Sequence, residues 1–207
     1  MEKEADLNED GYKFLPPTPV DKLVKQIEGH KVSNPGSELS PGRTHYELNS
    51  PTFLCSPAMV GLAQRFLPHC KTYFGQRMEH VKISTIQLVE SSPGSDEQVW
   101  HADNSKKGLT FVVALTDVTA ANGPTQFIER SHTQLKSLPR LFAPTLKMGQ
   151  VMVFDSRMVH RGLSNRASSR RDILVVRYDD TATPPPGMSF PGAMLRHLLG
   201  KLVATFS

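Results

Sequence analysis

The hydrophobic pattern in the middle of the chain has a period of two residues, which predicts β-strands. Residues 81–90 alternate in side-chain direction, and both faces carry apolar residues, which predicts a strand covered on two sides. Four further strand-like runs follow at 109–116, 125–129, 150–155 and 172–178, separated by clusters of Gly, Pro, Asn and Ser. Many short strands bounded by turns are typical of a sandwich or barrel. The pattern therefore predicts an all-β core with flanking helices.

Helical patterns are confined to three places. Residues 20–27 have apolar positions on one helical face, with Gly29 ending the segment, whereas Pro and Gly break the rest of 1–55 into an irregular arm. A longer helix starts at Ser56, a suitable N-cap, with Pro57 at its first position, and Pro68 is expected to kink or end it. After the Pro-rich segment 181–192, residues 194–203 again have helical spacing, which favours packing on the core over dimerisation.

The length and composition favour one domain. We expect a single domain over 1–207, divided into the arm (1–55), a helix with the β core (56–180) and a Pro-rich segment with a C-terminal helix (181–207). No apolar run approaches the roughly 20 residues of a membrane span, and the acidic N-terminus does not resemble a targeting segment. Cys55 and Cys70 are expected to be buried thiols of a reducing compartment, so the protein is expected to be intracellular, in the cytoplasm.

Three residues have the chemistry of a metal site. His101 and Asp103 stand at i and i+2, which on a strand directs both side chains to one face. This pair alone is a weak signal, but His160 follows the apolar run 150–155 and adds a second imidazole. Two imidazoles and a carboxylate on one side of an octahedron leave three positions open, the arrangement of non-haem Fe(II) oxygenases, whereas zinc prefers tetrahedral sets.

The arginines are concentrated near the end of the predicted core. The net charge is +4, and six of the twelve arginines fall between Arg157 and Arg177. A keto acid bound to the metal needs its far carboxylate held, and Arg170 or Arg171 can do this with a planar guanidinium. The other arginines are expected to form a solvated face, because no stripe of Lys accompanies them as in a nucleic-acid-binding surface.

Several motifs together resemble the phytanoyl-CoA dioxygenase-like family of Fe(II)/2-oxoglutarate oxygenases over about residues 83–178, nearly half of the chain. The matching residues are Gln98, His101 and Asp103 in Gln-x-x-His-x-Asp, the run Asn122-Gly123-Pro124-Thr125, the pair Ser131-His132, the segment from Phe154 to Gly162, and Asn165 and Arg171, five and eleven residues after His160. The resemblance implies a double-stranded β-helix (jelly-roll, cupin-like) fold with His101, Asp103 and His160 holding Fe(II). It also implies that 2-oxoglutarate is held by Arg171, with help from Thr125 and Gln98.

The resemblance implies hydroxylation of a small organic substrate by O2, with release of succinate and CO2. Halogenating relatives have Ala or Gly where this chain has Asp103. One alternative is a non-catalytic 2-oxoglutarate- or metal-binding module. Another is a cupin-like isomerase or hydrolase that uses another metal at the same ligands, and the presence of Arg171 argues against it. No nucleic acid or membrane partner is expected, and the substrate and oligomeric state stay open.

The chain departs from the family pattern in two ways. Glu129-Arg130 replaces a Pro-Gly pair, so the turn before His132 is expected to differ in backbone geometry, and the role of His132 stays open. The portion before His101 is short for the family, which leaves open whether it encloses a substrate. The remaining histidines are expected to be ordinary surface or core residues, and Trp100 a packing residue: His30, His45, His69, His80 and His197.

Overall fold

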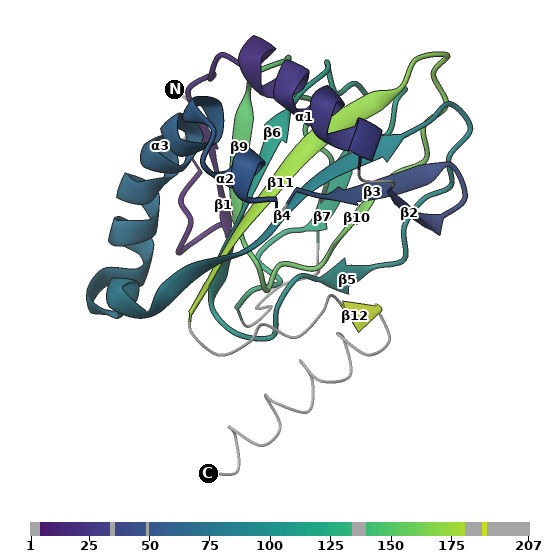
Figure 1. The fold of residues 1–207 in the computed structure, drawn as a ribbon. Coiled ribbons are helices and arrows are strands. Elements are labelled where there is room, and N and C mark those ends of the chain that lie inside the picture. Colours follow the sequence, from purple (N-terminus) through teal and green to yellow (C-terminus); the bar gives the residue numbers. More distant parts are fainter. Residues whose placement is uncertain (1–4, 34–35, 49, 134–139, 181–187, 190–207) are drawn as a thin grey trace.

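The computed structural model describes residues 5–33, 36–48, 50–133, 140–180 and 188–189 (Figure 1). Its helices are α1 (Asp21–Ser33), α2 (Pro51–Leu54) and α3 (Pro57–Phe74), and a 3-10 helix η1 (Gly75–His80) follows α3. The strands are β1 (Tyr12–Leu15), β2 (Ser37–Ser40), β3 (Arg43–Glu47), β4 (Val81–Ser91), β5 (His101–Ala102), β6 (Gly108–Ala114), β7 (Thr125–Ile128), β8 (Leu141–Phe142), β9 (Val151–Asp155), β10 (His160–Gly162), β11 (Arg171–Asp180) and β12 (Met188–Ser189).

The strands form two antiparallel sheets that pack as a sandwich. The larger sheet has the order β1-β9-β6-β11-β4-β3-β2, and the smaller has the order β12-β5-β10-β7-β8. The helices cover the outer face of the larger sheet (Figure 1). On β11, Leu174 and Val176 join the core beneath the helices, whereas Ile173 joins a second core that includes Phe127 of the smaller sheet. Both faces are buried, as the sequence predicted, and the double-stranded β-helix architecture is confirmed.

The N-terminal arm is more ordered than its sequence indicated. β1 pairs with β9 along the edge of the larger sheet, and β2 and β3 form a hairpin through Pro41 and Gly42 that extends the sheet beyond β4. Gly42 has a φ of 68°, which suits the turn. The expectation of an irregular arm was therefore wrong, because pairing with distant strands stabilises segments whose own pattern is weak.

Gly29 does not end the first helix, and Pro68 does not end α3. Gly29 lies inside α1, which continues to Ser33. The helix α3 begins as predicted, with the Ser56 hydroxyl accepting from the amide of Met59 (3.3 Å), but it passes through Pro68 to Phe74. Pro68 is exposed, so water can satisfy the carbonyl that loses its partner, while the buried side chains beyond it hold the last turns to the core.

The two cysteines differ, since Cys70 is buried in α3 whereas Cys55 is exposed, contrary to expectation, in the turn before α3. No helix within the described ranges is long and apolar enough to cross a membrane. The helix predicted at 194–203, and most of the Pro-rich segment, lie outside the described residues.

The turn before His132 keeps a conformation that suits glycine. Arg130 has a φ of 57°, and among the described non-glycine residues it alone has a positive φ. The chain therefore adopts the left-handed conformation even though it lacks the Pro-Gly pair. The guanidinium of Arg130 meets Asp10 at 2.9 Å in a largely exposed ion pair, which contributes little at the surface.

We expect Arg130→Gly to raise the free energy of unfolding by about 1 kcal/mol, because glycine lacks the steric penalty of a left-handed φ. Urea denaturation followed by circular dichroism measures this change. Arg130→Ala is the matched control, because it removes the ion pair but keeps a Cβ. Equal stability of the glycine and alanine variants would show that the turn is not strained.

Candidate metal and anion site

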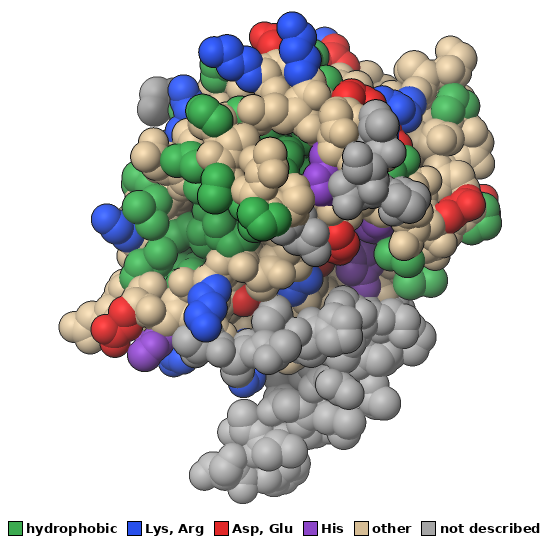
Figure 2. Space-filling model, viewed as in Figure 1, with side chains coloured by type: hydrophobic (Ala, Val, Ile, Leu, Met, Phe, Trp, Pro, Cys, Tyr) green, Lys and Arg blue, Asp and Glu red, His purple; other side chains and the backbone are tan. Residues whose placement is uncertain are grey.

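The predicted site residues line one cavity between the sheets. It has a volume of about 80 Å³, and its lining includes His101, Asp103, His160, Arg171, Thr125 and Gln98. A larger hollow of about 650 Å³ lies between α3 and the start of β4, where apolar side chains gather (Figure 2). The larger hollow contains none of the predicted site residues, so the chemistry of the site belongs to the smaller cavity.

Strand pairing brings the two histidines together. His160 lies on β10, a strand of its own, and its Cα is the direct partner of the His101 Cα on β5. Their ring centroids are 4.4 Å apart. Phe127 and Phe154 pack against the His160 ring at 5.6 and 4.9 Å between centroids, which limits its movement.

Hydrogen bonds determine which nitrogen of each ring can bind a metal. The Nδ1 of His101 lies 2.8 Å from the carbonyl of Val99, and the Nδ1 of His160 lies 2.9 Å from the carbonyl of Met158. A carbonyl only accepts, so both Nδ1 atoms carry the proton and both Nε2 atoms have a free lone pair. Each imidazole therefore presents Nε2 as its ligand atom.

Asp103 completes the set from just beyond β5. Its Oδ1 lies 3.9 Å from the Nε2 of His160, and one ligand atom from each of His101, Asp103 and His160 lies within 4.8 Å of the others. The backbone bends after Ala102, so the i and i+2 residues do not share one regular strand as we had expected. The geometry brings the three predicted ligands together nevertheless.

The electrostatic environment favours the protonation states that metals need. Burial, with His101 nearby, lowers the pKa of His160 to about 4. Burial alone would raise the pKa of Asp103, but the neighbouring His160 and Arg177 outweigh it and lower the pKa. A neutral imidazole and an ionised carboxylate result, and both are the forms that bind metal ions.

A second carboxylate cluster has a different character. Glu28, Glu90 and Asp172 also approach one another within 4.8 Å. Lys31 and Arg170 lie among them, with ion pairs of 2.6 Å from Lys31 to Glu90 and 2.7 Å from Arg170 to Asp172. The cluster is an ion-pair network, and it places Arg170 away from the cavity.

Two buried arginines line the cavity. Arg171, the first residue of β11, donates to the carbonyl of Gly123 and to the Ser91 hydroxyl (2.6 Å for the latter). Arg43 donates to the carbonyls of Asp96 and Leu163 at 2.9 and 3.0 Å. Within the described residues, neither guanidinium has an ion pair with a carboxylate, and both Nε atoms, with Nη1 of Arg43, are buried without a partner.

Burial without a counter-charge is costly for a cation. It lowers the pKa of Arg171 to about 9, helped by the charge of Arg43, and the pKa of Arg43 to about 10. Arg43 and Arg171 both pair in register with Ser91 of β4, so their side chains leave the same face of the sheet. The cavity therefore combines a metal-ligand set with donors that suit an anion.

The other predicted residues lie beside these arginines. The Gln98 side-chain oxygen accepts from the amide of Gly162 (2.9 Å), and Thr125 pairs with Gly162 across β7 and β10. A Cβ on Gly162 would lie 2.6 Å from Nη1 of Arg43, so only glycine fits here without a shift. The side-chain oxygen of Gln98 thus already accepts a hydrogen bond from the protein backbone.

Arg43 was not among the predicted site residues, and His45 was expected to be an ordinary histidine. Both lie on β3, two residues apart, and both line the cavity. Burial lowers the pKa of His45, which the neighbouring Gln87 side chain opposes. The signal that could have found them is the Pro41-Gly42 turn between two short alternating runs, which is typical of a hairpin.

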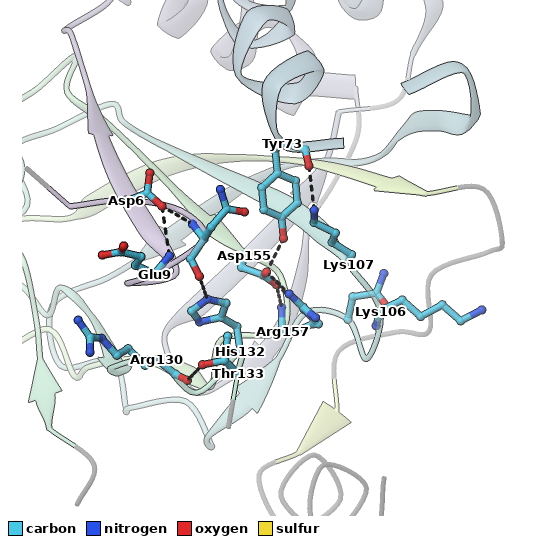
Figure 3. A network of polar contacts seen from close by, with 12 residues as sticks. Asp6, Glu9, Tyr73, Lys106, Lys107, Arg130, His132, Thr133, Asp155 and Arg157 are labelled. Carbon is cyan, nitrogen blue, oxygen red and sulfur yellow. Dashed lines mark hydrogen bonds and ion pairs between the residues drawn. The ribbon is translucent and has the colours of Figure 1, made fainter. Parts of the chain in front are cut away.

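His132 does not line the cavity. It is buried and donates from Nε2 to the carbonyl of Asn8 at 3.3 Å, so it ties the N-terminal segment to the turn after β7 (Figure 3). In the same region, Asp155 accepts from the Tyr73 hydroxyl and from Arg157, which joins α3 to the end of β9. These contacts indicate a structural role for His132.

Comparisons with known proteins agree with this geometry. The sequence profile described as phytanoyl-CoA dioxygenase (PhyH) matches residues 14–173. The dioxygenase easH of Epichloe festucae var. lolii is 36% identical over 95 residues, 37% of this chain and 51% of easH. The dioxygenase hkm4 of Aspergillus hancockii is 33% identical over 104 residues, 42% of this chain and 34% of hkm4. The chain thus spans about half of the first relative and a third of the second.

Solved structures share the fold. HygX from Streptomyces hygroscopicus, solved with nickel, 2-oxoglutarate and hygromycin B bound, has a TM-score of 0.66 at 14% identity, covering 84% of this chain and 85% of HygX. The α-ketoglutarate-dependent epimerase SnoN from nogalamycin biosynthesis has a TM-score of 0.65 at 16% identity, covering 84% of this chain and 80% of SnoN.

The profile match extends from β1 into β11 and includes every residue of the cavity named above. The donor set of two imidazoles and one carboxylate fits Fe(II), and the buried guanidiniums fit 2-oxoglutarate. The chain belongs to the phytanoyl-CoA dioxygenase family of Fe(II)/2-oxoglutarate-dependent oxygenases.

Proposed function

We propose that this protein is an Fe(II)/2-oxoglutarate-dependent dioxygenase that hydroxylates a small organic substrate and releases succinate and CO2. One observation carries the proposal. A single cavity joins three convergent ligand atoms, from His101, Asp103 and His160, to buried arginines that have no carboxylate partner among the described residues. A metal site alone would not need the arginines, and an anion site alone would not need the histidines.

The ligand residues would hold Fe(II) through Nε2 of His101, Nε2 of His160 and a carboxylate oxygen of Asp103. The hydrogen bonds to the Val99 and Met158 carbonyls fix both rings in the required tautomer. When bound, the iron with its keto acid supplies the oxidising chemistry that protein side chains lack. The role of the protein would be to orient these groups and to exclude water from them.

Arg171 would hold the distal carboxylate of 2-oxoglutarate, with Thr125 and Ser91 beside it. Its Nε is the buried donor that lacks a partner, while its two Nη atoms are fixed by Gly123 and Ser91. This fixation prepares the guanidinium for a carboxylate at little further cost in side-chain entropy. Arg43 adds a second positive charge on the same face, which favours a dianion over a neutral keto compound.

Hydroxylation is the reaction that the residues favour. Asp103 supplies the carboxylate where a halogenating site would need a free position for the halide. A nucleic-acid substrate is not proposed, because several of the clustered arginines are engaged in ion pairs: Arg157 with Asp155, Arg161 with Glu97 and Arg170 with Asp172. The family implies a small-molecule substrate and O2.

An anaerobic titration tests the proposal. Fe(II) and 2-oxoglutarate are added together, and we expect the weak visible charge-transfer band of a keto acid chelated to iron, followed by succinate formation in air. The absence of the band would refute the proposed site. A band without succinate, measured with a broad panel of small organic compounds, would favour the non-catalytic binding module.

A further inference from the structure

The two oxygens of the Asp103 carboxylate have different surroundings. Oδ1 lies 3.9 Å from the Nε2 of His160 and so faces the other ligand atoms. Oδ2 lies 2.6 Å from the hydroxyl of Thr110, which is on β6 and almost fully buried. One oxygen is therefore available to a metal ion, while the other is engaged behind it.

The direction of these hydrogen bonds follows from proton counting. An ionised carboxylate only accepts, so Thr110 must donate its single hydroxyl proton to Asp103. The hydroxyl of Ser156 lies 3.0 Å from that of Thr110 and can bond to it only by donating. The hydrogen bonds thus run in one direction, from the fully buried Ser156 through Thr110 to the accepting carboxylate of Asp103.

The backbone of Asp103 is held separately. Arg177 donates from Nη2 to the main-chain carbonyl of Asp103 at 2.7 Å, and it forms an ion pair of 3.5 Å with Asp179. The main chain at Asp103 is therefore fixed without Thr110, and the bond from Thr110 determines how the carboxylate is turned.

We propose that Thr110 is a positioning residue that makes Asp103 a one-oxygen ligand. The inference rests on the proposed function. A carboxylate that chelates with both oxygens takes two of the six positions of an octahedral ion, and with two histidines it would leave only two positions. A keto acid that chelates takes both, so none would remain for O2. By engaging Oδ2, Thr110 keeps the third position open.

Packing alone does not require a hydroxyl at this position. Val112, two residues along β6 and so on the same face as Thr110, is buried and apolar, as is Phe154, the register partner of Thr110 on β9, and valine has nearly the same shape as threonine. The side-chain hydrogen bonds of the Thr110 hydroxyl go to Asp103 and Ser156. Thr110→Val should therefore fold, while it frees Oδ2.

The test uses the intact protein loaded with Mn(II), whose bound waters are counted by water-proton relaxation, and then titrated with 2-oxoglutarate. We expect Thr110→Val to bind Mn(II) with one metal-bound water fewer than the parent, and to keep no metal-bound water once 2-oxoglutarate is bound, where the parent keeps one. Thr110→Ser, which keeps the hydroxyl, should restore both. Thr119→Val is the control, because its hydroxyl accepts from Asn122 in a turn outside the cavity lining.

An unchanged number of waters in Thr110→Val would overturn the proposal, and so would a folded Thr110→Val that no longer binds Mn(II), since the hydroxyl would then support the site in another way. Failure of the parent protein to bind Mn(II) or 2-oxoglutarate would instead refute the proposed function. Circular dichroism of each variant separates these outcomes from a loss of fold.

Discussion

Iron-dependent succinate formation should fall at least about 100-fold in each of the variants His101→Ala, Asp103→Ala and His160→Ala. Loss of a residue that merely supports a metal ligand already costs about 10 to 100-fold, and these three residues are the proposed ligands themselves. The measurements are succinate release in air and Fe(II) affinity by anaerobic competition with a chelator.

The fold should persist in all three variants. His101 and Asp103 are only partly buried, and His160 lies at the cavity wall, so removal of the ring enlarges an existing hollow. Circular dichroism and thermal unfolding test this. His80→Ala is the matched control, because that exposed ring pairs with Glu79 on η1. A folded variant that still turns over would remove its residue from the metal site.

The second large effect concerns Arg171, the first residue of β11, and Arg170, which directly precedes it. We expect Arg171→Lys to weaken 2-oxoglutarate binding by ~1.5–3 kcal/mol, the size of a charged hydrogen bond, while iron affinity barely changes. Lysine keeps the charge but loses the planar fork, in which two separate nitrogens bond to Gly123 and Ser91 and hold the third toward the cavity. Titration of 2-oxoglutarate into the anaerobic Fe(II) protein measures the loss.

Arg170→Lys is the matched control for this experiment. Arg170 is the preceding residue, yet it points to the opposite side, where it contacts Glu28, Glu90 and Asp172. We expect its substitution to leave 2-oxoglutarate affinity within error of the parent. Equal losses in the two variants would indicate a general effect of charge, and a larger loss in Arg170→Lys would mean that the other face of this strand binds the co-substrate.

Much of the fold was predictable because its signals are local. The five strands expected at 81–90, 109–116, 125–129, 150–155 and 172–178 correspond to β4, β6, β7, β9 and β11 within a few residues. Alternation marks a strand without knowledge of its partners. The start of α3 was equally local, since Ser56 and Pro57 meet the needs of a helix N-terminus from within the same turn.

The sequence alone also determined which residue types could form the site. His101, Asp103 and His160 were selected from side-chain chemistry, and Arg170 and Arg171 as the two candidates for the anion. The strand register decided which of Arg170 and Arg171 faces the cavity, because successive residues along an extended chain face opposite sides of a sheet. Sequence fixes that alternation but not which side contains the metal ligands. Only the pairing of β11 with β4 and β6 oriented Arg171 toward the cavity.

Tertiary structure alone decided the features that depend on distant partners. The hairpin that carries Arg43 and His45 is a sheet edge formed against β4, and the pairing of His101 with His160 joins strands 59 residues apart in the sequence. Arg130 keeps a left-handed φ without glycine, and α3 continues through Pro68, since contacts elsewhere offset each local cost. Local pattern therefore specified the elements and the chemistry of this protein. Long-range strand pairing specified how the site residues come together. Burial and sheet hydrogen bonds stabilise the fold by more than an unfavourable local backbone conformation costs, so they decide where such conformations occur.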